Sequence, residues 1–239
     1  MIKSRPMLLF GLAMMALLCC VGCDRLPGKP KLTDIALTPQ QVTNFTVLFD
    51  QNCSGCHGKN GRGNGALALN NPIFLAIAND DAIRHAIANG VSGTQMPGFL
   101  DSAGGALTEK QIEILVREIR LNWSRPAEVG SNPPPYTAST PANTNHGAEV
   151  YATFCASCHG RDGNGSSQAH SIVDGSYLAL VSDQNLRTLV IAGRPDLQHP
   201  DWRNYIADRA MTQQEVTDVV AWLGSKRVAY PGRPYREKL

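Results

Sequence analysis

The segment Cys53-Ser-Gly-Cys56-His57 lies in the first half of this 239-residue chain, and Cys155-Ala-Ser-Cys158-His159 repeats its pattern in the second half. In each copy, two cysteines are separated by two residues and a histidine follows directly. A glycine comes next and opens a glycine-rich stretch. This spacing is typical of covalent attachment of a c-type haem, in which both thiols bond to the porphyrin and the histidine binds its iron.

Two other interpretations of these cysteines fit the sequence less well. A thioredoxin-like redox pair has the same spacing, but no βαβ pattern surrounds either copy. Four cysteines could bind zinc, but a zinc site does not account for a histidine directly after each pair. The sequence therefore predicts two covalently bound haem c groups, attached through Cys53, Cys56, Cys155 and Cys158, with His57 and His159 as iron ligands.

The first residues have the pattern of an export signal. Lys3 and Arg5 precede an apolar stretch over residues 7–18, which is short for a bilayer span. The junction Cys20-Val-Gly-Cys23 resembles a bacterial lipobox, although Cys20 stands where such signals usually have leucine. We therefore expect a lipoprotein signal peptide at 1–22 and a lipidated Cys23 on the periplasmic face of a bacterial inner membrane. Ordinary secretion and an uncleaved anchor are the alternatives.

Cysteine use and charge exclude several functions. Of the seven cysteines, four are assigned to haem, two lie in the signal and Cys23 is the anchor, so none remains for a disulfide or a catalytic thiolate. The 22 Lys and Arg residues nearly balance the 20 Asp and Glu residues, which does not favour a nucleic-acid partner. The C-terminal segment 229–239 is basic, and it is either a solvated tail or a contact for anionic headgroups or an acidic partner.

Proline-rich segments divide the chain. Residues 23–39 are the expected anchor linker, and residues 40–125 form the first expected domain. Residues 126–142, which include Pro133-Pro-Pro135, are predicted to be a semi-stiff linker. The second expected domain follows at 143–228.

Both expected domains are helical in pattern, and strand signals are nearly absent. The first should contain helices over 42–52 and 81–89 and a last helix that begins at Thr108-Glu109. The second should contain helices over 147–154 and 184–192 and a last helix that begins at Thr212-Gln213. The predicted fold class is therefore all-α.

With these elements in order, each half resembles a class I cytochrome c, over about residues 40–125 and 143–228. In that family the first and last helices cross through a glycine and an aromatic residue. The second half supplies Gly147, Tyr151 and Trp222, whereas the first has Phe45 and Glu118 where the glycine and an aromatic are expected. The resemblance implies two tandem domains, each wrapped around one covalent haem, with a different helix crossing in the first.

Class I cytochromes usually bind the far side of the iron with a methionine, often followed by proline. Met96-Pro97 fits this pattern in the first domain, and a Met/His ligand pair raises the haem potential. A methionine that only fills the core is the alternative.

The second domain has a histidine at the corresponding position. Gly90 precedes Met96 by the same spacing as Gly193 precedes His199, so His199-Pro200 replaces Met96-Pro97. We therefore predict a bis-histidine second haem, through His159 and His199, with a lower potential than the first. Met211, His170 and an open site are the alternatives. Three arginines are either propionate partners or solvent-facing side chains: Arg84, Arg187 and Arg194.

These features predict a membrane-anchored di-haem electron-transfer protein rather than an enzyme. It would pass single electrons to or from a redox protein or respiratory complex, as a carrier or as a fixed subunit. The alternative is a di-haem oxidoreductase of the thiosulfate or peroxide type with a catalytic second haem, which would require His199 to leave the iron.

Overall fold

The computed structural model describes Gly28, Lys31 and residues 36–130 and 132–229. The expected signal peptide, Cys23 and nearly all of the basic tail lie outside the described residues. The chain separates into a unit at residues 1–38 and a unit at residues 39–239, and the features below belong to the second unit. Among the described residues, no helix has the length and apolar character needed to cross a membrane.

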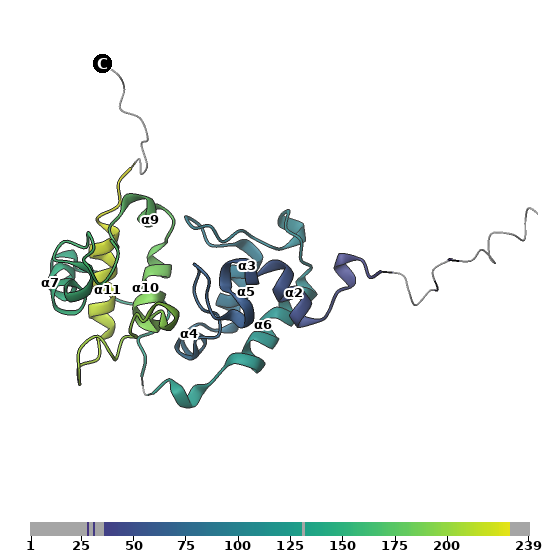
Figure 1. The fold of residues 1–239 in the computed structure, drawn as a ribbon, viewed down its shortest axis with the longest axis horizontal. Helices are drawn as coiled ribbons and strands as arrows, with labels where there is room; N and C mark the ends of the chain where they lie inside the picture. Colours follow the sequence, from purple (N-terminus) through teal and green to yellow (C-terminus); the bar gives the residue numbers. More distant parts are fainter. Residues whose placement is uncertain (1–27, 29–30, 32–35, 131, 230–239) are drawn as a thin grey trace, which may run out of the picture. The chain divides into compact units, whose positions relative to one another are not determined.

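The described part of the second unit is built from helices without strands, as the predicted fold class requires (Figure 1). The helices of the first half are α2 (Phe45–Asn52), α3 (Ser54–His57), α4 (Pro72–Ile77), α5 (Asp80–Asn89) and α6 (Glu109–Trp123), with 3-10 turns at Pro39–Gln41, Lys59–Gly61, Asp101–Ala103 and Pro126–Glu128. Those of the second half are α7 (Thr144–Phe154), α8 (Ala156–His159), α9 (Gly175–Ala179), α10 (Asp183–Ala192) and α11 (Gln213–Gly224), with a 3-10 turn at Pro195–Leu197.

Side-chain caps explain where these helices begin. Thr108 and Thr212 form capping boxes with Gln111 and Glu215, so α6 and α11 start as the sequence predicts. The first helix begins at Phe45 rather than at residue 42, because Asn44 accepts a hydrogen bond from the Val47 amide.

The helix α7 starts earlier than expected. Asn143 caps it by accepting hydrogen bonds from the amides of Asn145 and His146, so the helix begins at Thr144 rather than at residue 147. His146, expected just before the helix, therefore lies in its first turn.

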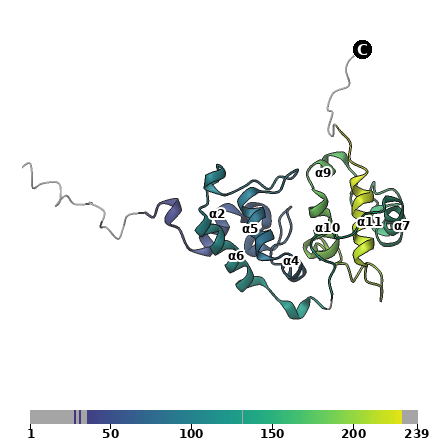
Figure 2. The ribbon, with the colours of Figure 1, turned by 180° about the vertical axis from the view of Figure 1, so that it is seen from behind.

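The second domain contains the helix crossing that the family resemblance implies. Helices α7 and α11 pack side by side, as Figures 1 and 2 show from opposite directions. Gly147 brings the two backbones together, and a Cβ atom built on it would lie 3.0 Å from the Cβ of Trp222. The rings of Tyr151 and Trp222 stack with centroids 4.1 Å apart. The lack of a side chain at Gly147 and the stacked rings of Tyr151 and Trp222 together determine how closely the two helices pack.

A polar pair closes the start of the same crossing. The Asp218 side chain is 1% exposed, and its carboxylate accepts hydrogen bonds from the Asn143 amide at 2.7 Å and from the His146 ring at 2.7 Å. Burial by itself would raise the pKa of Asp218, but these hydrogen bonds outweigh it and lower that pKa. The same contact raises the pKa of His146.

The first domain crosses its helices differently, as its sequence suggested. Three aromatic rings fill the contact between α2 and α6. The Phe45 and Phe49 rings lie 5.7 Å and 5.0 Å from the ring of Trp123, both edge-on. Phe45 occupies the place of the expected glycine, so large rings separate the helices that Gly147 allows to touch in the second domain.

The proline-rich segment between the domains is hydrogen-bonded to the second domain at several of its described residues. Arg203 donates to the carbonyls of Glu128 and Val129, at 3.3 Å and 2.8 Å. Arg187 donates from Nε to the carbonyls of Pro135 and Tyr136, at 3.0 Å and 3.1 Å. The segment is therefore bonded to the second domain rather than suspended between two bodies.

Candidate haem sites

The first attachment motif lies where α2 ends and the short helix α3 begins. Cys53 is half-buried and Cys56 is exposed, and neither forms a disulfide. His57 ends α3, and its Nδ1 atom lies 2.8 Å from the carbonyl oxygen of Leu67. Such a bond fixes the tautomer with Nδ1 protonated and leaves Nε2 available for a metal.

The second motif has the same geometry. Cys155 is half-buried, Cys158 is exposed, and both are free. His159 ends α8, and its Nδ1 atom lies 3.0 Å from the carbonyl oxygen of His170. His170 thus contributes a backbone carbonyl to this site, while its side chain is exposed.

The first cysteine of each motif, Cys53 or Cys155, has a thiol that stays protonated at neutral pH. Burial first, and the neighbouring cysteine second, raise the pKa of Cys53 and of Cys155 to about 12. Because the thiolate is the reactive form, these thiols differ from the activated cysteine of a redox pair at neutral pH.

A glycine-rich turn follows each motif and is hydrogen-bonded to the backbone of the motif's histidine. Gly58 and Gly160 have φ of 75° and 79°, and a Cβ atom on either would lie 2.5 Å from a carbonyl oxygen across the loop. The amides of Gly63 and Gly165 donate to the carbonyls of His57 and His159, at 2.7 Å and 2.9 Å. The glycines therefore let the backbone turn tightly beside His57 and His159, the two predicted iron ligands.

The distal loop of the second domain presents His199 to His159. Arg194 and His199 exchange two backbone hydrogen bonds, both 3.0 Å long, which fold the loop into a tight bridge. The two imidazole centroids lie 6.1 Å apart. Two imidazoles that each bind one ion through a nitrogen at about 2 Å have centroids about 6 Å apart. The pair therefore has the spacing needed to hold one haem iron between the rings.

Packing orients the His199 ring. The ring of Tyr205 meets it edge-on at 5.6 Å, and the Tyr205 hydroxyl donates to the Val190 carbonyl at 3.0 Å. Burial, followed by the charge of His159, lowers the pKa of His199 to about 4, which keeps the ring neutral and its lone pair free. Sequence reasoning missed Tyr205, because nothing in its local pattern places it against His199.

The corresponding loop of the first domain carries Met96. The amide of Val91 donates to the Met96 carbonyl at 3.0 Å, and the Met96 amide donates to the Thr94 hydroxyl at 3.1 Å. Gly90 begins this loop as Gly193 begins the other, and a Cβ atom on either would collide with the loop backbone. Met96 is half-buried, and in the alignment of the two repeats it corresponds to His199 of the second domain.

The remaining ligand candidates of the second domain have other surroundings. Met211 is 1% exposed and lies in the hydrophobic core, as does Leu107 at the same position of the first domain. Its amide donates to the carbonyl of Trp202 at 2.8 Å. Core packing accounts for Met211 without a role at the iron.

The three arginines differ from one another. Arg84 is half-exposed and lies 3.7 Å from Glu113. Arg187 is buried rather than solvent-facing. Its Nε atom donates to the linker carbonyls, and its Nη1 atom donates to the Thr217 hydroxyl. Arg194 forms a paired contact with Asp196.

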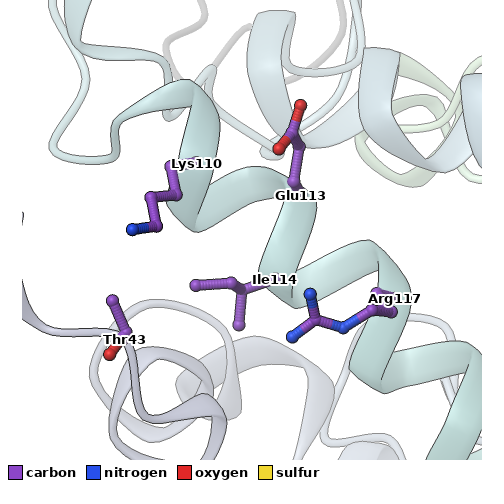
Figure 3. A pocket seen from close by; sticks show the side chains of 5 residues that line it. All are labelled: Thr43, Lys110, Glu113, Ile114 and Arg117. Carbon is purple, nitrogen blue, oxygen red and sulfur yellow. The ribbon is translucent and has the colours of Figure 1, made fainter.

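A cavity of about 440 Å³ lies beside α6, and no predicted ligand histidine lines it (Figure 3). Side chains of α6 line one side of it and Thr43 faces them; the α6 residues are Lys110, Glu113, Ile114 and Arg117. Because no predicted haem ligand or attachment cysteine lines it, this charged groove is not the redox centre.

Family comparisons agree with this arrangement. Residues 40–117 match the family described as cytochrome c oxidase, cbb3-type, subunit III, and residues 145–226 match the family described as cytochrome c. The chain is a c-type cytochrome with two tandem cytochrome c domains. The two domain matches confirm the predicted cofactors: the chain carries two c-type haems.

The curated relatives are oxidase subunits. The cbb3-type cytochrome c oxidase subunit FixPc of Rhizobium leguminosarum bv. viciae is 27% identical over 203 residues, which cover 80% of this chain and 64% of the relative. The subunit CcoP of Cereibacter sphaeroides is 30% identical over 162 residues, which cover 62% of this chain and 51% of the relative. The chain therefore spans between half and two-thirds of these relatives.

Proposed function

We propose that this protein passes single electrons through its two haem domains to a respiratory oxidase complex of the cbb3 type. The facing rings of His159 and His199, set against Met96 at the same position of the first domain, carry this proposal. Two unlike ligand sets in one chain suit a relay with a direction. The similarity to cbb3 oxidase subunits supports the choice of partner.

The residues of the chain have separate roles in this function. The four motif cysteines would attach the cofactors. His57 and Met96 would bind the first iron, and His159 and His199 would bind the second. The haem groups supply the one-electron chemistry, and the protein supplies ligands, burial and orientation. The Nδ1 contacts to Leu67 and His170 hold the two attached imidazoles in place.

The ligand sets give the transfer a direction. An imidazole donates more strongly to ferric iron than a thioether does, so the His/His site should have the lower potential and the Met/His site the higher one. Electrons would therefore enter through the second domain and leave through the first.

A catalytic second haem is less compatible with the distal loop. It would require His199 to leave the iron and return during turnover. Two backbone hydrogen bonds to Arg194 and the edge of Tyr205 hold His199 in position. These contacts favour a permanent ligand and therefore electron transfer over catalysis.

We also propose that lipidated Cys23 holds the protein on the periplasmic face of the inner membrane. Several acyl chains on one residue give stable anchoring, because each buried methylene adds about 0.8 kcal/mol. The variant Cys23→Ser should move from the membrane fraction to the soluble periplasmic fraction while keeping its haems. Mass spectrometry of the unaltered mature protein should find acyl chains on Cys23, and their absence would rule this anchor out.

Exchanging the distal ligands tests the relay. Potentiometric titration of the haem-loaded protein should give two separate waves. In the variant His199→Met, the midpoint potential of the lower wave should rise, because a thioether replaces an imidazole. The rise should be at least about 59 mV, which is a tenfold change in the ferrous/ferric ratio for one electron.

The reciprocal variant Met96→His is the matched control, and it should lower the upper wave and leave the lower one in place. A single wave in the unaltered protein, or a His199→Met protein whose two waves do not move, would contradict the ligand assignment.

A further inference from the structure

The two haem domains meet at a buried contact within the unit formed by residues 39–239. Helix α10 lies between α11 of its own domain and α4 of the first domain in both views (Figures 1 and 2). Asn71 is 3% exposed, and its side-chain amide donates to the carbonyl of Ala192 at 2.8 Å. Ala192 immediately precedes the loop that carries His199, so this bond ties the first domain to the base of the second domain's distal loop.

An ion pair in that loop extends the contact. Arg194 donates from Nε and Nη2 to both carboxylate oxygens of Asp196, at 2.8 Å and 2.6 Å. The Arg194 side chain is only 11% exposed, and its Nη1 atom lies 3.4 Å from the carbonyl oxygen of Gly65 in the first domain. Asp196 packs on Gly63, where an added Cβ atom would lie 2.8 Å from the Asp196 carboxylate.

This ion pair lies between backbone segments that carry a ligand of each site. On one side, Arg194 exchanges both backbone hydrogen bonds with His199. On the other, the amide of Gly63 donates to the carbonyl of His57 at 2.7 Å, so the loop under Asp196 is bonded to the proximal ligand of the first domain.

We propose that the charges of the Arg194–Asp196 pair act on both haem sites and set their two potentials together. This inference rests on the proposed electron-transfer function and names two residues that control it. A cation near a haem disfavours the ferric state, which carries one more positive charge, and therefore raises the potential; an anion lowers it. Because the Arg194 side chain is only 11% exposed, water screens its charge less than it screens a surface charge, and a change in the net charge of the pair acts on both sites.

Single-charge variants of the haem-loaded full chain test the proposal by potentiometric titration. Arg194→Gln leaves the Asp196 carboxylate unpaired, and both midpoints should fall. Asp196→Asn leaves the guanidinium unpaired, and both midpoints should rise. We expect roughly a tenfold change in the ferrous/ferric ratio in each case, about 59 mV for a one-electron couple.

The double variant Arg194→Gln with Asp196→Asn separates charge from packing. It has no net charge change, so both midpoints should return to within about twofold of the unaltered values if charge is the cause. Arg120→Gln is the control, because Arg120 pairs with Asp80 and both residues lie on helices of the first domain rather than in a loop that carries a predicted iron ligand. It should shift neither midpoint by more than about twofold.

Two outcomes would overturn the proposal. Single variants that move the midpoints in the same direction, with a double variant that does not recover, would assign the pair a packing role alone. A shift of one midpoint without the other would show that the pair acts on one site only. Since the titration measures each haem without any partner, neither result depends on whether the protein delivers electrons to an oxidase.

Discussion

Replacing Cys155 and Cys158 together by alanine is expected to leave a protein with a single covalent haem. Thioether attachment needs a thiol at the porphyrin, and alanine supplies none. The second domain should then lose most of its stability, because a short helical domain of this kind packs around its cofactor. Mass spectrometry of the denatured protein measures the effect, since only covalently attached haem survives unfolding.

The first domain provides the reciprocal control. The pair Cys53→Ala and Cys56→Ala should remove the other haem and leave the second in place, so the two variants should have equal masses of bound haem. Ser157→Gly, which copies Gly55 of the first motif, should retain both haems. Two haems remaining in the Cys155/Cys158 variant would mean that another residue makes the attachment.

Local signals in the sequence predicted most of the helices. The capping threonines Thr108 and Thr212 and the apolar spacing that follows them place the start of the last helix in each half. The register of the internal repeat also placed His199 at the position of Met96, and the 6.1 Å separation of its ring from that of His159 is compatible with that alignment. These features depend on neighbours within a few residues or on the repeat itself.

Contacts between distant segments could not be predicted in this way. Arg187 aligns with Arg84, yet Arg84 is half-exposed while Arg187 is buried beneath the linker. The bond from Asn71 to Ala192 joins residues of different domains, and an asparagine before a helix reads equally well as a simple cap. The role of each of these side chains depends on a partner residue that lies at no fixed spacing along the chain.

The asymmetry between the domains follows from the same limit. Both copies retain the attachment motif and the glycine loops, which covalent geometry requires. They differ where packing alone decides, such as the helix crossing, with rings of Phe45 and Trp123 in one and Gly147 against Trp222 in the other. A repeat therefore predicts the site better than it predicts the packing that supports it.

The crossing in the second domain is sensitive to one carbon atom. In the variant Gly147→Ala, the new Cβ would lie 2.7 Å from the carbonyl carbon of Asp218 and 3.0 Å from the Cβ of Trp222. Backbone cannot give way as a flexible side chain can, so α7 and α11 must move apart and unstack Tyr151 from Trp222. Overpacking of this kind costs about 1–3 kcal/mol, occasionally more.

Alanine also favours a helix interior over glycine by about 1 kcal/mol, so a net loss requires that the clash exceeds that gain. We expect a net destabilisation of about 1 kcal/mol, measured as a lower midpoint of denaturant unfolding followed by tryptophan fluorescence. Gly55→Ala is the control, because a Cβ atom there meets nothing within 4 Å, and its unfolding midpoint should not fall. If Gly147→Ala unfolds at the same denaturant concentration as the unaltered chain, the helices are not held as closely as this crossing requires.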